Sequence, residues 1–267
     1  MSEERSLSLT GVNTRVLVRG EGPPVLFLHG NPDTAELWDG LIDALATSYR
    51  CYAPDMPGFG ASKLTQDNDF SLDTMATFVS ELVDALEIHE PLRLVMHDFG
   101  GPYGFSWAVR NPERVEQIVA INTFFFPRFR WHFWARVWRT PILGELSVYL
   151  MRWPVARLEL GRGSRRLTTA QMRAVYDRVT PETRQTILRL YRATDPEVFE
   201  PWQEKLAALT SHVPTAVIWG MRDPYLPASF IERFGAREAH RLEDCGHWPP
   251  SERTDDTAAL LKSFFAK

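Results

Sequence analysis

The feature that most constrains the fold is an apolar run that ends abruptly in a carboxylate and two glycines. Residues 94–101 read Leu-Val-Met-His-Asp-Phe-Gly-Gly. Such a run predicts a buried strand that turns sharply into a helix, with Asp98 at the turn and Gly100 small enough to let the turn close. A side chain on such a turn projects from the edge of a parallel sheet. We therefore predict an α/β fold in which Asp98 is a candidate nucleophile.

Alternating apolar runs and turn signals extend this architecture along the chain. Residues 7–10 and 14–19 predict an antiparallel pair joined at residues 11–13. In residues 72–86 apolar side chains recur at helical spacing, with Ser71 as a candidate N-cap. We predict a mostly parallel eight-stranded sheet flanked by helices. The other strands are expected in the run that ends at Asp98 and at residues 24–28, 50–54, 117–122, 215–219 and 239–242, and the other helices at 34–46, 102–110 and 255–265.

Charge is distributed unevenly, and this predicts a separate inserted unit. The 267 residues carry a net charge of -4, but residues 124–210 hold 15 Lys and Arg against 8 Asp and Glu, together with five of the nine tryptophans. We therefore divide the chain into a core, residues 1–123 and 211–267, and an inserted segment, residues 124–210. Its arginines are scattered among apolar residues, so we expect them to cover buried aromatic rings. We expect neither a nucleic acid nor a membrane as a partner.

Cysteine content and the lack of long apolar runs favour an intracellular protein. Only Cys51 and Cys245 are present, too few for a disulfide framework. The first ten residues lack the apolar stretch of a secretory signal, and no uncharged apolar run reaches the roughly 18 residues that would span a bilayer. We predict a cytoplasmic protein that acts on a small hydrophobic substrate.

Two more polar residues follow predicted strands in the second half of the core. Asp223 follows the strand at 215–219, and His247 follows the strand at 239–242. The carboxyl ends of parallel strands meet at one edge of a sheet, so these two side chains are expected beside Asp98. Their order along the chain is nucleophile, acid and then histidine, which is the order in α/β-hydrolases. We predict a catalytic triad of Asp98, Asp223 and His247.

Four motifs resemble the haloalkane dehalogenase and epoxide hydrolase branch of the α/β-hydrolases. The resemblance covers nearly the whole core and implies the α/β-hydrolase fold, with residues 124–210 at the position of the family's helical cap. The motifs are His29-Gly30-Asn31-Pro32, residues 53–62, the Asp98 turn and Gly246-His247-Trp248-Pro249.

The residue types imply a covalent mechanism that requires no metal and no organic cofactor. An aspartate near its usual pKa is ionised at neutral pH, so Asp98 attacks an alkyl carbon directly and forms an ester. His247, held in one tautomer by Asp223, then removes a proton from the water that hydrolyses this ester. The backbone N–H groups of Asn31 and Phe99 are the expected oxyanion donors, as in other hydrolases of this fold.

The identity of the leaving group stays open at this point. The resemblance implies that a halide binds the side chain of Asn31 and an indole directly after the nucleophile. This chain has Phe99 at that place, and a phenyl ring has no N–H to donate. An indole of the inserted segment is the alternative donor, with Trp131, Trp134, Trp138 and Trp153 as candidates.

An epoxide hydrolase of this branch instead uses cap tyrosines as acids, here Tyr149, Tyr176 or Tyr191. The expected substrate-binding residues are therefore Trp131, Trp134, Tyr149, Tyr176 and Tyr191.

Three other functions are less favoured. Fluoroacetate dehalogenases have arginine where this chain has Phe99. A carboxylate-bearing substrate stays an alternative only because the inserted segment offers arginines that could bind it, namely Arg128, Arg130, Arg136 and Arg139. A non-catalytic binding protein of this fold would have little reason to keep the triad. A serine esterase is disfavoured because Ser106 lies inside a predicted helix.

Overall fold

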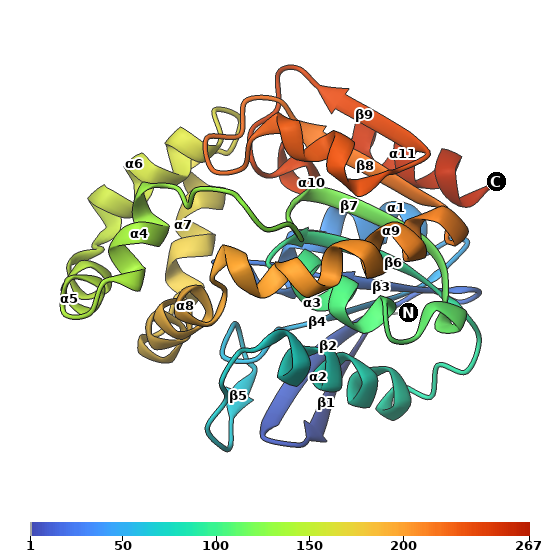
Figure 1. Ribbon diagram of the computed structural model, residues 1–267, viewed down its shortest axis with the longest axis horizontal. Coiled ribbons are helices and arrows are strands. Elements are labelled where there is room, and N and C mark those ends of the chain that lie inside the picture. The colour runs from blue at the N-terminus through green and yellow to red at the C-terminus, as the bar shows by residue number, and fades with distance from the viewer. Residues whose placement is uncertain (1) are drawn as a thin grey trace.

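The computed structural model describes residues 2–267. In these residues the strands are β1 (Ser2–Leu9), β2 (Val12–Arg19), β3 (Pro24–Leu28), β4 (Arg50–Pro54), β5 (Lys63–Leu64), β6 (Leu92–Asp98), β7 (Val115–Thr123), β8 (Thr215–Gly220) and β9 (Glu238–Leu242). They form one sheet with the order β1-β2-β4-β3-β6-β7-β8-β9, and β5 pairs with β2 (Figure 1). β1, β2 and β4 pair antiparallel, and the strands from β4 to β9 along this order run parallel.

The central strands are apolar on both faces because helices cover both faces. Every residue of β3, β6 and β8 is buried, whereas the edge strand β9 has a more exposed pattern. Continuous apolar runs of this kind are typical of parallel strands that lie between two helical layers. The predicted fold class, a mostly parallel sheet flanked by helices, is therefore confirmed.

Two helical layers enclose the sheet. Apolar side chains of α1 and α11 pack on one face, and those of α2, α3 and α9 pack on the other. Short 3-10 helices lie at 35–38, 112–114, 196–202 and 228–234. The α-helices are α1 (Asp39–Leu45), α2 (Leu72–Ala85), α3 (Gly100–Ala108), α4 (Phe133–Arg139), α5 (Leu143–Leu150), α6 (Trp153–Gly163), α7 (Thr169–Arg178), α8 (Pro181–Ala193), α9 (Gln203–His212), α10 (Pro249–Glu252) and α11 (Thr254–Phe265).

Helix α2 matches the periodicity of its sequence closely. The side chain of Ser71 accepts a hydrogen bond from the backbone N–H of Thr74, at 3.2 Å, which satisfies one of the free donors of the first turn. Met75, Val79 and Leu82 lie on the buried side. The predicted N-cap is therefore confirmed.

Several predicted boundaries are corrected. The turn of the first hairpin lies at residues 10–11 and not at 11–13, since Val12 is a buried residue of β2 that already pairs with Leu9. The ninth strand, β5, was not predicted, since two residues are too short to show a periodicity. The helix expected at 34–46 starts with a 3-10 turn before α1. α3 starts at Gly100, and Pro102 lies in its first turn, where a missing N–H costs little.

The segment between β7 and β8 is helical. Figure 1 shows α4, α5, α6 and α7 at one end of the molecule, away from both chain ends. The predicted boundary at residue 210 falls within α9, and Leu206 and Leu209 of this helix pack in the buried cluster under the sheet. The division into a core and an inserted segment stays a prediction. Within residues 2–267, no helix has both the length and the hydropathy needed to cross a bilayer.

Candidate active site

Asp98 stands at a strained turn between β6 and α3. Its φ is 47°, in the left-handed region that a non-glycine residue rarely adopts. The turn leaves no room for a larger side chain at Gly100, where an added Cβ would lie 2.0 Å from the carbonyl oxygen of Leu28. At Gly30 an added Cβ would lie 2.5 Å from the Cβ of Asp98. The two glycines therefore allow the Asp98 carboxylate to approach the loop that follows β3.

The predicted acid and histidine are in contact at the same edge of the sheet. Asp223 follows β8 and His247 follows β9, and the distance from Nδ1 of His247 to Oδ2 of Asp223 is 2.7 Å. Both side chains are almost fully buried. Because the Asp223 carboxylate accepts the Nδ1 proton, Nε2 of His247 is left to exchange protons with the cavity.

Asn122, at the end of β7, fixes the position of Asp223 and was not identified in the sequence. Its amide nitrogen donates to Oδ2 of Asp223, and its amide oxygen accepts from the backbone N–H of Gly220, both at 2.7 Å. The side chain therefore ties the ends of two neighbouring strands to the acid. Its position at the end of the strand predicted at 117–122 was the signal that could have identified it as a site residue.

Burial and neighbouring charges set the charges of Asp98 and His247. It raises the pKa of Asp98 to about 6, although His247 and the backbone N–H groups of Asn31 and Phe99 act in the opposite direction. The expectation of a usual pKa for Asp98 was wrong, because the carboxylate has lost its water. Burial lowers the pKa of His247, but the carboxylates of Asp223, Asp98 and Asp33 outweigh it and raise the pKa to about 9. At neutral pH the site therefore holds an aspartate and an imidazolium.

The two expected oxyanion donors lie beside Asp98. The backbone N–H of Asn31 donates to Oδ2 of Asp98 at 2.9 Å. The backbone N–H of Phe99 also contributes a hydrogen bond that lowers the pKa of Asp98. Donors that already face this oxygen need no reorganisation when negative charge develops there.

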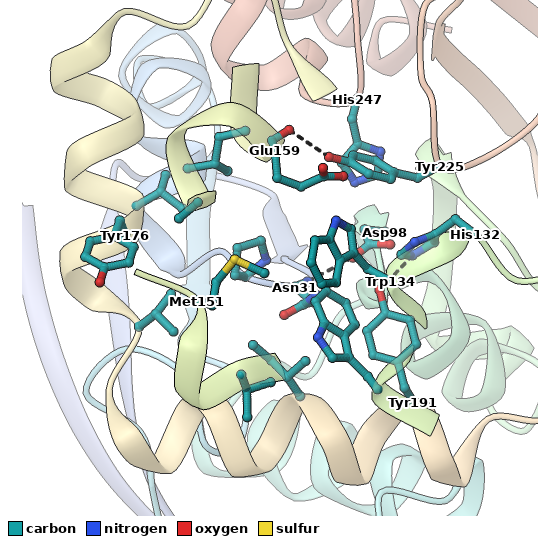
Figure 2. A pocket seen from close by; sticks show the side chains of 18 of the residues that line it. Asn31, Asp98, His132, Trp134, Met151, Glu159, Tyr176, Tyr191, Tyr225 and His247 are labelled. Carbon is teal, nitrogen blue, oxygen red and sulfur yellow. Dashed lines mark hydrogen bonds between the residues drawn. The ribbon is translucent and has the colours of Figure 1, made fainter. Parts of the chain in front are cut away.

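A mostly apolar cavity of about 120 Å³ opens on these groups (Figure 2). Asn31, Asp98 and His247 line it from the sheet edge. Four of the five predicted substrate-binding residues line it from the inserted segment, namely Trp131, Trp134, Tyr176 and Tyr191. Among residues 2–267, no group of three or more His, Cys, Asp and Glu side chains is arranged to hold a metal ion.

Tyr149 is the fifth predicted substrate-binding residue, and its prediction is wrong. Its side chain lies on the outer side of α5, 67% exposed, and does not line the cavity. The buried side of the same helix presents Val148 instead. Residue type alone does not indicate which side of a helix faces a cavity.

Phe99 does not line the cavity. Its ring lies beneath two cavity residues, stacked on Trp131 with centroids 6.1 Å apart and edge-to-face with Tyr191 at 4.9 Å. The indole nitrogen of Trp131 is buried and has no hydrogen-bond partner in residues 2–267. A buried N–H without a partner is costly, so this donor is available to an acceptor in the cavity.

The hydroxyl of Tyr191 is a second donor on the same wall. It lies 3.2 Å from Nε2 of His132, a contact that Figure 2 shows next to Asp98. Burial, and then the charge of Asp98, raise the pKa of Tyr191 well above its usual value, so the phenol keeps its proton. Burial lowers the pKa of His132 to about 4, so this imidazole is neutral. His132 was not identified in the sequence, where one histidine among many aromatic residues carries no signal.

Asp33 is a third buried acidic residue near His247. Oδ2 of Asp33 accepts from the indole of Trp248 at 2.9 Å, and Nε2 of His97 lies 2.8 Å from the carbonyl oxygen of His247. Burial raises the pKa of Asp33 to about 7, while the indole of Trp248 and the charge of His247 lower it. These contacts hold the loop that carries His247, and they were missed because they join residues far apart in the sequence.

Residues 23–254 match the family described as the alpha/beta hydrolase fold. The chain belongs to this family. The chain is 31% identical over 256 residues to haloalkane dehalogenase 2 of Mycobacterium tuberculosis, and the match covers 91% of this chain and 87% of the relative. It is 26% identical to the cis-3-alkyl-4-alkyloxetan-2-one decarboxylase of Shewanella oneidensis, covering 98% of this chain and 87% of that relative.

Solved structures show the same fold. The epoxide hydrolase of Vigna radiata is similar with a TM-score of 0.84 and 21% sequence identity, covering 99% of this chain and 98% of that one. At this identity the likeness concerns the fold. The family match and the named relatives show that this protein is an enzyme of the hydrolase class.

Proposed function

We propose that the enzyme hydrolyses a carbon–halogen bond of a small apolar substrate through a covalent ester on Asp98. The observation that carries the proposal is the ionised, buried carboxylate of Asp98 at the wall of an apolar cavity, beside His247. A carboxylate stripped of water is a stronger nucleophile toward an alkyl carbon than one in solution.

In the first step an oxygen of Asp98 attacks the carbon that bears the halogen. The new carbon–oxygen bond forms as the carbon–halogen bond breaks, and the halide leaves with the bonding electron pair. The charge moves from Asp98 to the halide, so the step needs no proton. The free indole N–H of Trp131, together with the side chain of Asn31, supplies the donors for the halide.

Esterification of Asp98 changes the state of His247. The negative charge of Asp98 is one of the causes that raise the pKa of His247, and the ester has no such charge. The imidazolium therefore loses its proton more readily and becomes a general base at Nε2. The charge of Asp98 thus keeps His247 protonated before the reaction, and the loss of this charge on alkylation lets His247 give up its proton.

In the second step His247 removes a proton from water, and the water oxygen attacks the carbonyl carbon of the ester. The backbone N–H groups of Asn31 and Phe99 face the oxygen on which the negative charge develops. On collapse, His247 returns its proton to the departing oxygen, which leaves as the alcohol, and then accepts the proton of the new carboxylic acid, which restores the Asp98 carboxylate and the imidazolium. The net reaction converts an alkyl halide and water into an alcohol, a halide ion and a proton.

Epoxide hydrolysis to a vicinal diol is the second candidate, and the hydroxyl of Tyr191 favours it. Ring opening leaves an alkoxide, which needs a proton, and Tyr191 is a protonated phenol on the wall that faces Asp98. A halide needs no such acid.

An anionic haloacid is a poor fit to the cavity. Arg128, Arg130 and Arg136 are exposed, and Arg139 is paired with Asp195, so none of these four lines the cavity. The side chain of Glu159 does line it, as does that of Asp98. An anionic substrate would therefore meet two acidic side chains, and the cationic groups that line the cavity are Arg184 and the His247 imidazolium, which is already paired with Asp223.

The deciding experiment uses the His247→Phe variant, which can form the ester but cannot hydrolyse it. The variant is incubated with alkyl halides and with epoxides, and intact mass is measured. An increment equal to the alkyl group supports halide displacement, whereas an increment equal to a hydroxyalkyl group supports epoxide opening.

The control is the Asp98→Asn/His247→Phe double variant, which has no carboxylate to alkylate and should keep its mass. An adduct on both variants, or no adduct with any substrate that the wild type converts, would contradict the covalent mechanism.

A further inference from the structure

Exposed apolar side chains are concentrated on one part of the surface. Eight of the nine large apolar residues that are exposed in residues 2–267 lie between positions 133 and 158, and the ninth is Val198. Ile142 is 82% exposed and Leu158 is 76% exposed. A cluster of this kind on a protein surface marks an interaction site more often than isolated residues do.

These residues follow the helical repeat on the outer sides of α5 and α6. Ile142, Leu143, Leu146, Tyr149 and Leu150 recur at spacings of three and four, whereas Gly144 and Val148 are buried. On α6, Val155 and Leu158 are exposed, whereas Ala156 and Leu160 are buried. The apolar face is defined here as Ile142, Leu143, Leu146, Tyr149, Leu150, Val155 and Leu158.

The segment that carries the apolar face is rich in arginine. Residues 128–166 contain nine arginines and two glutamates, and no lysine or aspartate. Arg152 and Arg157 are exposed and form no ion pair with any residue of 2–267, and the guanidinium of Arg152 lies 5.7 Å from the ring centroid of Tyr149. Glu145 is paired with Arg192. The surface therefore combines aliphatic side chains with the positive charge of Arg152 and Arg157, which no acidic side chain of residues 2–267 neutralises.

The same two helices form a wall of the cavity. Val148 and Met151 line it from α5 and from the residue after this helix, and Ala156 and Leu160 line it from α6. One side of this helical pair thus faces the cavity while the other side is the apolar face. Figure 1 shows α5 and α6 at the end of the molecule that lies away from both chain ends.

We propose that the apolar face docks on an anionic lipid bilayer. The leucines would lie among the acyl chains, and the arginines would contact the headgroup phosphates, as in amphipathic helices that lie in the interface plane. A second copy of this chain would bring two positively charged surfaces together. A nucleic acid would gain nothing from aliphatic side chains, which neither stack on bases nor donate hydrogen bonds. The proposal replaces the sequence-based expectation of no membrane partner, and it does not depend on the reaction at Asp98.

The first test is co-sedimentation of the full chain with vesicles. Binding is expected to vesicles of phosphatidylcholine and phosphatidylglycerol, and much less to pure phosphatidylcholine. The Leu146→Glu/Leu158→Glu variant should bind at least about tenfold more weakly, and each arginine lost in Arg152→Gln/Arg157→Gln should cost about fivefold. Val198→Glu is the matched control and should bind like the wild type.

A probe on the surface separates insertion from simple attraction of charges. Cys51 and Cys245 are buried, so a cysteine at position 146 can be labelled selectively with an environment-sensitive dye. The emission of Leu146→Cys should shift to the blue on anionic vesicles, whereas that of Val198→Cys should not. Absence of vesicle binding, equal binding by the leucine variant, or self-association that replaces vesicle binding would each overturn the proposal.

Discussion

Asp98 and His247 share one buried environment, and each sets the charge of the other. Asp98 loses hydration and gains a nearby imidazolium, and the net result is a pKa of about 6. His247 gains three carboxylates as neighbours, which outweigh its burial. The proposed reaction uses this coupling, because alkylation of Asp98 removes one of the charges that keep His247 protonated.

The coupling makes the alkylation step depend on pH in a defined direction. In the wild type, the rate of ester formation in a single turnover should fall as pH decreases through about 6, since protonated Asp98 is not nucleophilic. In His247→Phe the midpoint should move to higher pH, because the cation that lowers the pKa of Asp98 is gone. Rapid quenching followed by intact mass measures both. A wild-type midpoint near the usual value of about 4 would refute the assignment.

Substitutions of Trp131 and Tyr191 distinguish halide displacement from epoxide opening. If halide is the leaving group, Trp131→Phe should slow alkylation about 10-fold to 100-fold, because a donor to a charged group is lost, while Tyr191→Phe should have little effect. With an epoxide, Tyr191→Phe should be the damaging change, by about 100-fold or more, because the acid is lost. Both variants keep an aromatic ring that packs against the ring of Phe99. Equal losses in the two variants would indicate a packing defect in place of lost hydrogen bonds.

Among the elements, the turn from β6 into α3 shows how local sequence and tertiary contacts combine. The apolar run and the glycines predict a strand, a tight turn and a helix, and the structure has them in that order. The exact start of α3 at Gly100 depends on the neighbouring strand β3, whose carbonyl at Leu28 occupies the space of a side chain. The sequence therefore indicates the elements more reliably than their ends.

Helix α2 offers a direct test of capping. Ser71→Ala should reduce the free energy of unfolding by about 1 kcal/mol, because the N–H of Thr74 loses its acceptor. Thr77→Ala, at an exposed position in the same helix, is the control and should change stability little. Denaturant titration followed by circular dichroism measures both. An equal loss in the two variants would mean that the N-cap contributes nothing.

The whole molecule has two buried layers, one on each face of the sheet, and both of its cysteines are buried. Cys51 is fully buried in β4, and Cys245 is fully buried in the loop before His247. Burial raises the pKa of the Cys51 thiol to about 12, which removes the reactive thiolate at neutral pH. Neither thiol should react with an aromatic disulfide reagent in the native protein, and both should react after unfolding.

The reaction of each thiol therefore measures opening of the structure. If opening of the whole fold controls access, both thiols should react with the same dependence on denaturant. Fast reaction of Cys245 alone would show instead that the loop carrying His247 opens independently. The same measurement is the control for selective labelling at position 146.

The sequence was sufficient for the order of the eight longer strands, the turn at Asp98 and the meeting of Asp98, Asp223 and His247 at one edge of the sheet. Each of these depends on signals that are local in the chain, such as a run of apolar residues, a glycine pair or a polar residue after a strand. Parallel strands then bring their carboxyl ends together in any sheet of this order, so Asp98, Asp223 and His247 had to meet.

Tertiary packing determined the rest of the site. Tyr149 and Tyr176 are equivalent as residue types, yet one is exposed and the other lines the cavity, because neighbouring helices select the buried side. The support from Asn122 and Asp33 joins distant parts of the chain. The pKa of Asp98 depends on how much water the surrounding atoms exclude, and the exposed side of α5 and α6 depends on which elements cover it. These are properties of the assembled molecule, since burial is a sum over neighbours that sequence spacing does not specify.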